Sequence, residues 1–301
     1  MPHAPTAPRA SSALLALATA LLLAGCASLG DRAAPRDAGG TDRPRATRNV
    51  DHGPWPNPAT RQLVVVLTPN WDAPQGRLAR FERDAGGAWR PVGSSFPVMV
   101  GRSGSAWGLG VHAPQADGPQ KAEGDGRAPA GVFAIGTAFG YGATTATRLA
   151  YAPMQREHWC IDVPGSPDYN RIVDTREVGT KAIEGSTEPM RRDLHKDGDA
   201  RYRLGFVIEH NAAGVDRAGS CIFAHLWQAP GVPTAGCTAM ADADMSTLLG
   251  WLDPAATPRF VLLPVQAYAR LQAAWDLPAP GGGNPNAGPA GGTPAGRDAH
   301  E

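Results

Sequence analysis

The stretch Gln62–Thr68, which reads QLVVVLT, decides the fold of this chain. It is apolar and rich in β-branched residues, and turn residues follow it, which is typical of a strand buried on both faces. Further strands are predicted in five segments, at 77–82, 96–100, 203–210, 220–227 and 259–263. Glycine and proline contribute 37 and 29 of the 301 residues, so turns are frequent. We therefore expect a mostly β domain with few helices, an α+β fold built as a β-sandwich or a mixed sheet.

Two helices are predicted near the end of this region. In the first, Asp242 is expected to cap the N-terminus and Pro254 to end the helix. Its apolar residues have helical spacing: Met245, Leu248, Leu249 and Leu252. A second helical stripe follows Pro264 and consists of Val265, Tyr268, Leu271 and Trp275.

The N-terminus has the composition of an export signal. Residues 13–24 (ALLALATALLLA) form an apolar run that is shorter than the ~20 residues needed to span a bilayer. The run ends in Leu23-Ala24-Gly25-Cys26, which resembles the lipobox of bacterial lipoproteins. We expect residues 1–25 to be a lipoprotein signal peptide and Cys26 to carry the lipid; the alternative is an ordinary signal peptide with an incidental cysteine. Because Ala27 is not aspartate, the resemblance implies a periplasmic protein anchored in the outer membrane.

The remaining chain divides by composition. Residues 26–60 are rich in Ala, Arg, Asp, Gly and Pro and predict a flexible tether. Residues 61–276 contain the apolar patterns of one domain. Residues 277–301 are rich in glycine and proline and bury too little apolar surface to offset their ordering entropy, so we expect a disordered tail.

Charge and motif content exclude several classes of function. Lys plus Arg and Asp plus Glu are 28 each, a balance that argues against a nucleic-acid binder. No GxGxxG or P-loop stands between a strand and a helix, so no nucleotide is expected. The possible metal ligands have no CxxC, HExxH or HxH spacing, so neither a metal nor another cofactor is expected; these ligands are His158, Cys160, His210, His225 and Cys237.

Cysteine chemistry is the strongest functional signal. Disulfides persist outside the cytoplasm, and with Cys26 lipidated an odd number of cysteines remains. In Thr234-Ala235-Gly236-Cys237 the glycine permits close backbone approach, and two N–H groups can face an oxyanion. The predicted helix a few residues later would favour the thiolate. His225, twelve residues earlier at a strand end, is the nearest base. The structural alternatives are a core histidine and a small buried cysteine.

At these residues the chain resembles a known family. His225 followed by Thr234-Ala235-Gly236-Cys237 resembles the His … Ser/Thr-x-Gly-Cys signature of the YkuD-type L,D-transpeptidases, in particular an exported branch with a TAGCxA motif. Three further segments are similar to that branch: residues 121–133 (KAEGDGRAPAGVF), 166–170 (SPDYN) and 205–211 (GFVIEHN, with His210 where tyrosine is usual). Within the first of them, Asp125-Gly126, Pro129 and Gly131 predict turns.

The resemblance implies an L,D-transpeptidase-like catalytic domain acting on peptidoglycan stem peptides. Cys237 would attack the carbonyl before the terminal D-Ala of a tetrapeptide, and His225 would move the protons. The N–H of Cys237, helped by that of Gly236, would stabilise the oxyanion. An amine acceptor gives a cross-link, whereas water gives L,D-carboxypeptidase activity. A non-catalytic peptidoglycan-binding lipoprotein is the remaining alternative.

The chain also departs from the family pattern. Ala235 and Ala239 occupy positions where histidine and arginine are common, so the group that would hold a substrate carboxylate is in question. Arg191, Arg192 or Arg217 could supply that charge, although solvated surface arginines are expected. The candidate substrate contacts, each with a structural alternative, are Thr234, Thr238, His210, Asn211, Tyr169 and Asn170. Cys160 and Cys221 are expected to pair and to leave Cys237 free.

Overall fold

Strand β1 (Gln62–Thr68) has the bounds predicted for the QLVVVLT segment. The computed structural model describes residues 50–279. In it, β1 pairs in parallel with β14 (Arg259–Pro264) and antiparallel with β2 (Gln75–Glu82), and its side chains are buried on both faces. The prediction of a mostly β domain with few helices is confirmed.

The main sheet closes on itself. The barrel strands are, in sheet order, β1, β14, β6 (Ala128–Gly140), β11 (Leu204–Ile208), β12 (Phe223–Leu226), β13 (Thr238–Met240), β4 (Phe96–Met99) and β2. Pairing of β2 with β1 completes the circle. The closed sheet contains parallel and antiparallel pairs, which agrees with the expected mixed sheet and not with the alternative of a sandwich. Three short strands extend it: β3 (Arg90–Pro91), β5 (Ser105–Trp107) and β7 (Tyr151–Pro153).

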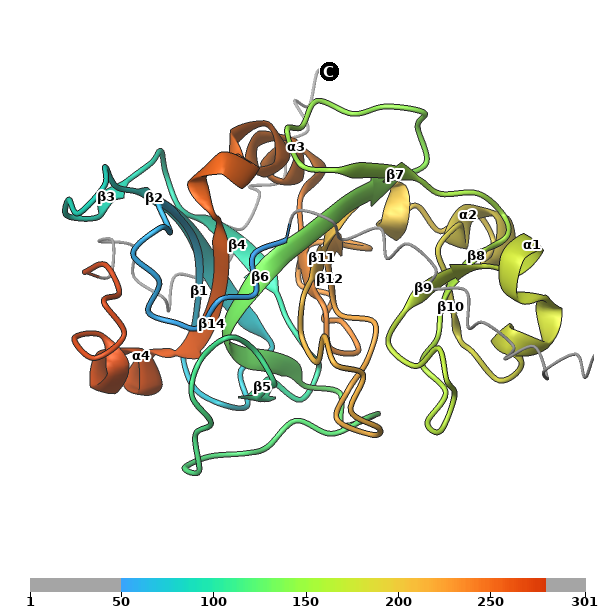
Figure 1. Cartoon of the computed structure of the whole chain (residues 1–301), viewed down its shortest axis with the longest axis horizontal. Helices are drawn as coiled ribbons and strands as arrows, with labels where there is room; N and C mark the ends of the chain where they lie inside the picture. The colour runs from blue at the N-terminus through green and yellow to red at the C-terminus, as the bar shows by residue number, and fades with distance from the viewer. Residues whose placement is uncertain (1–49, 280–301) are drawn as a thin grey trace, which may run out of the picture. The chain divides into compact units, whose positions relative to one another are not determined.

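A side lobe, residues 154–203, lies between β7 and β11 in the chain and contains a second sheet (Figure 1). Its strands are β8 (His158–Cys160), β9 (Ile172–Asp174) and β10 (Glu188–Pro189). Its helical turns are α1 (Thr175–Val178), η1 (Thr180–Ile183), α2 (Arg192–His195) and η2 (Arg201–Arg203). The rest of the helical structure is α3 (Asp242–Trp251), η3 (Pro254–Ala256) and α4 (Val265–Leu271). None of the helices between residues 50 and 279 has the length and apolar content to cross a membrane.

The longest strand, β6, replaces the turns predicted around Pro129 and Gly131. Pro129 lies beside the short strand β5, and Gly131 has a φ of 135° inside the strand. A Cβ at Gly131 would lie 2.0 Å from Cε1 of the buried His112. Pro129 and Gly131 therefore serve close packing within a strand and do not form a turn.

Both predicted helices are present, with differences at their ends. The N-cap of α3 is Ala241 without a side-chain bond, whereas Asp242 lies in the first turn and binds Arg203 at 2.8 Å. The predicted capping role of Asp242 is therefore wrong, although a carboxylate in a first helical turn remains favourable. Helix α4 ends at Leu271, and Trp275 packs beyond it against Trp107.

The domain extends past both boundaries predicted from composition. Trp55 is buried and its backbone N–H donates to Val111 O, so the end of the expected tether belongs to the folded part. At the other end Leu277 is buried, and Tyr268 donates to Pro278 O at 2.7 Å. The expected signal peptide, Cys26, and most of the tether and tail lie outside the residues described.

Replacing Gly131 with alanine should destabilise the barrel strongly. The change adds about 1–2 kcal/mol of left-handed backbone strain and about 1–3 kcal/mol of overpacking against His112. Gly165→Ala is the matched control, because Gly165 also has a positive φ but a Cβ there would meet no atom of a neighbouring segment within 4 Å. Urea unfolding should show a clearly larger loss for Gly131→Ala, and equal losses would contradict the packing role of β6.

Candidate active site

Cys237 and His225 come together because β12 and β13 are parallel neighbours. The register pairs Ala224 with Thr238 and His225 with Ala239, and the Phe223 N–H donates to Cys237 Sγ at 3.3 Å. Side chains alternate along a strand, so His225 faces the same side as Phe223, the neighbour of Cys237. Strand spacings of ~3.3 and ~4.8 Å put the Cα atoms of the two residues about 8 Å apart. The structure thus brings the predicted nucleophile and base onto one face of the sheet.

The ring of His225 is held by a backbone carbonyl. Nδ1 lies 2.7 Å from Leu226 O, and because a carbonyl only accepts, Nδ1 carries the proton. Nε2 of the neutral ring then keeps its lone pair. Burial lowers the pKa of His225 to about 4, so the ring is neutral at physiological pH. This neutral tautomer is the form that can accept a proton from a thiol.

Cys237 is a buried, free thiol. Its Sγ lies 3.5 Å from Cys221 O, to which the S–H can donate. Burial, with the nearby charge of Glu188 as a further cause, raises the thiol pKa to about 12. The resting pair is therefore a neutral thiol and a neutral imidazole. The expected help from a helix terminus is missing, because β13 separates Cys237 from the start of α3.

Thr234 fixes the turn that leads to the thiol. Its hydroxyl donates to Cys237 O at 2.7 Å and accepts from the Gly236 N–H at 3.1 Å. The Gly236 amide is thus directed at Thr234 and not at a position where an oxyanion would form. Thr238 is buried in β13. Both threonines therefore shape the backbone around Cys237.

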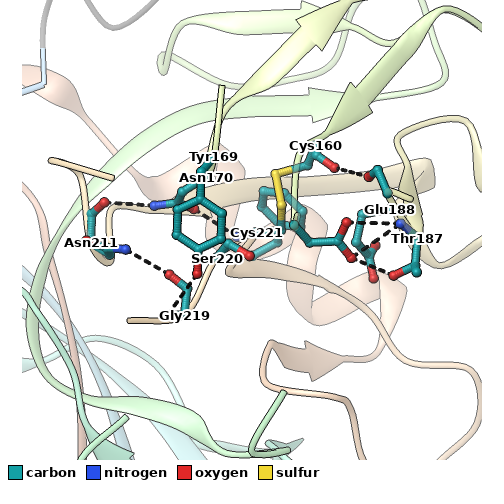
Figure 2. The surroundings of a disulfide bond; sticks show 12 residues. Cys160, Tyr169, Asn170, Thr187, Glu188, Asn211, Gly219, Ser220 and Cys221 are labelled. Carbon is teal, nitrogen blue, oxygen red and sulfur yellow. Dashed lines mark hydrogen bonds between the residues drawn. A yellow bond between two sulfur atoms is a disulfide. The ribbon is translucent and has the colours of Figure 1, made fainter. Parts of the chain in front are cut away.

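Cys160 and Cys221 form the expected disulfide, with an S–S distance of 2.06 Å. The bond joins β8 of the side lobe to the segment just before β12 (Figure 2). Cys221 has a φ of 55°, a conformation that non-glycine residues rarely adopt. All three described cysteines lie in one apolar cluster with Tyr202 and Phe223.

The family-like segments meet at residues 219–221 (Figure 2). Glu123 accepts from the hydroxyls of Tyr169 and Ser220. Asn170 accepts from the Cys221 N–H at 2.8 Å, and Asn211 donates to Gly219 O at 3.0 Å. The polar groups of Tyr169, Asn170 and Asn211 are engaged inside the protein, so these residues hold the backbone that leads into β12.

His210 is likewise satisfied within the fold. Its Nδ1 accepts from the Leu109 N–H at 3.2 Å, and its Nε2 lies 3.0 Å from Ala218 O. Burial lowers its pKa to about 4. These contacts agree with a structural role for His210 and not with a contact to a substrate.

The side lobe adds a charged network that the sequence did not reveal. Tyr202 packs its ring against His225 with centroids 5.1 Å apart and donates to Glu188 Oε2 at 2.7 Å. Arg192 binds both Glu188 and Asp199. No short-range motif marks Tyr202 or Glu188, since each reaches the site through the fold of the lobe.

The three arginines considered as carboxylate anchors differ in their environment. The side chain of Arg192 is only 11% exposed and is paired with two carboxylates, so the expectation of a solvated arginine is wrong there. Arg191 is paired with Asp193 and is 19% exposed. Arg217 is 76% exposed, as expected.

Comparisons with known proteins returned nothing: no family model, no curated protein and no solved structure matches this chain. Within residues 50–279, no three His, Cys, Asp or Glu side chains are grouped in a way that could hold a metal ion.

The pH dependence of the alkylation rate of Cys237 should show that its thiol is neutral at physiological pH. With a thiol pKa near 12, the thiolate fraction and hence the rate should rise about tenfold per pH unit between about pH 7 and pH 10. Peptide mapping by mass spectrometry after iodoacetamide treatment follows Cys237 separately from Cys26, and Cys160 and Cys221 are oxidised. A rate plateau already reached below neutral pH would indicate a preformed thiolate–imidazolium pair and contradict this description.

Removing the Asn170 side chain should lower the free energy of unfolding, because this side chain holds the segment that leads into β12. Asn170→Gly tolerates the φ of 61° but leaves the Cys221 N–H without its acceptor, at a cost of about 1–3 kcal/mol. Asn70→Gly is the control, because Asn70 is exposed and its side chain bonds only the exposed Asp72 N–H. In chemical denaturation Asn170→Gly should lose more free energy of unfolding than Asn70→Gly. Similar losses would argue against a scaffold role for Asn170.

Proposed function

We propose that this protein is a cysteine acyltransferase of the cell wall, an L,D-transpeptidase acting on peptidoglycan stem peptides. The proposal includes an L,D-transpeptidase-like catalytic domain, export, and a lipid on Cys26 that anchors the protein in the outer membrane facing the periplasm. It requires no cofactor.

The observation that carries the proposal is the placement of a free thiol and an oriented neutral imidazole on one face of two neighbouring strands. Cys237 and His225 lie on neighbouring strands, and Leu226 O fixes the ring so that Nε2 has the lone pair. The other two described cysteines are joined, so they cannot compete as nucleophiles. A nucleophile, a base and a group that orients the base are the parts that covalent acyl transfer needs.

The chemistry follows from the protonation states. Because thiol and imidazole are both neutral at rest, proton transfer from Cys237 to His225 Nε2 accompanies attack on the substrate carbonyl. The sulfur forms a C–S bond to the carbonyl before the terminal D-Ala. The imidazolium then gives its proton to the leaving amine, and D-Ala departs. An amine from a second stem peptide attacks the thioester and regenerates the thiol.

The oxyanion of this intermediate needs a donor. With the Gly236 N–H bound to Thr234 Oγ1, the Cys237 amide is the donor we assign. Thr234 contributes indirectly, because its bond to Cys237 O fixes the peptide plane next to that amide. Its role is one of positioning.

Incubation of the purified full chain with disaccharide tetrapeptides tests the proposal. Chromatography and mass spectrometry should find released D-Ala and dimers with 3–3 cross-links. Cys237→Ala should abolish both, and His225→Gln should lower the rate about 10²–10⁴-fold because the proton acceptor is lost. His195→Gln is the matched control, because His195 lies on α2 and contacts Arg156 O and Trp159.

The products separate the alternatives. Tripeptides without dimers would indicate an L,D-carboxypeptidase that uses the same thiol. Binding of peptidoglycan without release of D-Ala would indicate a non-catalytic lipoprotein, and would contradict the acyltransferase proposal.

A further inference from the structure

One half-buried carboxylate of the side lobe is linked to His225 through Tyr202. Glu188, the first residue of β10, accepts a 2.7 Å hydrogen bond from the Tyr202 hydroxyl. The Tyr202 ring contacts both His225, at 5.1 Å between centroids, and Phe223, at 5.5 Å. A single tyrosine side chain therefore separates this carboxylate from the base of the proposed reaction.

The two oxygens of Glu188 have different surroundings. Oε2 accepts hydrogen bonds from the Tyr202 hydroxyl and, at 3.2 Å, from Arg192 Nη1. For Oε1 the structure gives no donor among residues 50–279. Asp199, the other carboxylate of the network, is bonded on both oxygens by Arg192 and Arg201. Glu188 thus has acceptor capacity left for a ligand, whereas Asp199 is saturated by guanidinium groups.

Access and charge fit a cationic group at this position. The Glu188 side chain is 22% exposed, about twice the exposure of its partner Arg192. Burial raises the pKa of Glu188, and its charge is among the causes that raise the pKa of Cys237. A cation bound at Oε1 would counter both effects, since a positive charge favours the ionised carboxylate and offsets its field at the thiol.

We propose that Glu188 is the acceptor-binding residue: its Oε1 binds the primary ammonium of the acceptor substrate and takes one proton from it. The inference rests on the proposed acyltransferase function and deepens it. It assigns the binding of the acceptor in the second half of the reaction to the side lobe, while Cys237 and His225 act in both halves.

The proton balance of the step is closed within these groups. The ammonium transfers one proton to Glu188, which leaves a neutral amine and a neutral carboxylic acid. The amine nitrogen forms a C–N bond to the acyl carbon, and the C–S bond to Cys237 breaks. The second nitrogen proton moves through His225 Nε2 to the departing sulfur, and the third remains on the new amide.

Glu188→Gln tests the assignment, because the amide keeps the size of the side chain and an acceptor for Tyr202 but loses the charge. Glu184→Gln is the matched control, since Glu184 is an exposed glutamate of the same lobe. The measured quantities are the rate at which Cys237 is acylated and the ratio of cross-linked to hydrolysed product. Glu188→Gln should lower this ratio about tenfold, as expected for loss of a charged hydrogen bond. Acylation of Cys237 should not slow, because removal of the Glu188 charge also removes one cause of the raised thiol pKa.

The outcomes distinguish this assignment from the proposed function. An unchanged ratio with normal acylation would overturn the role of Glu188 and leave the acyltransferase intact. A raised KM for the tetrapeptide donor with an unchanged ratio would place the ammonium of the donor there, and would also overturn it. Absence of acylation in the unsubstituted protein would contradict both the role of Glu188 and the proposed acyltransferase function. If Glu188→Gln does not fold, Glu188→Asp, which retains the charge, should keep a ratio above that of Glu188→Ala, and equal ratios would contradict the assignment.

Discussion

The parallel pairing of β12 with β13 is the contact on which the site depends. It sets Phe223 beside Cys237 and leaves His225 on the same face of the sheet. The neighbouring strands β11 and β4 hold this pair from both sides within the closed barrel. A shift of one residue in either strand would turn its side chain to the other face and separate thiol from imidazole.

Much of the surrounding structure secures the start of β12. Three segments that are distant in sequence supply Glu123, the adjacent pair Tyr169 and Asn170, and Asn211, and their bonds meet on residues 219–221. The disulfide adds a covalent link from the side lobe at Cys221, next to the carbonyl that receives the Cys237 thiol (Figure 2). The residues of segments 121–133, 166–170 and 205–211 that form these bonds therefore act as a scaffold for the backbone that leads to Cys221 and β12.

The sequence predicted local elements better than their assembly. Strand β1 agrees with expectation because a run of β-branched residues is a local signal. The Cys160–Cys221 bond agrees because Cys26 and Cys237 are assigned other roles, which leaves these two cysteines to pair. Strand β6 was missed because Pro129 and Gly131 resemble turn residues until His112 is seen packed against the backbone. Barrel closure depends on β1 pairing with two strands, and no local pattern encodes the second partner. Cys237 and His225 were predicted as a pair from motif resemblance, whereas Tyr202 and Glu188 come near them only through tertiary packing.

The most direct measurement of the central claim is the intact mass of the protein, quenched in acid during exposure to a tetrapeptide donor and then mapped by peptide fragmentation. The account predicts an adduct that adds the mass of the donor minus that of free D-Ala, carried on Cys237 as a thioester that hydroxylamine removes. An adduct on another residue, or turnover of the donor without any adduct when deacylation is made slow by withholding an acceptor amine, would contradict it.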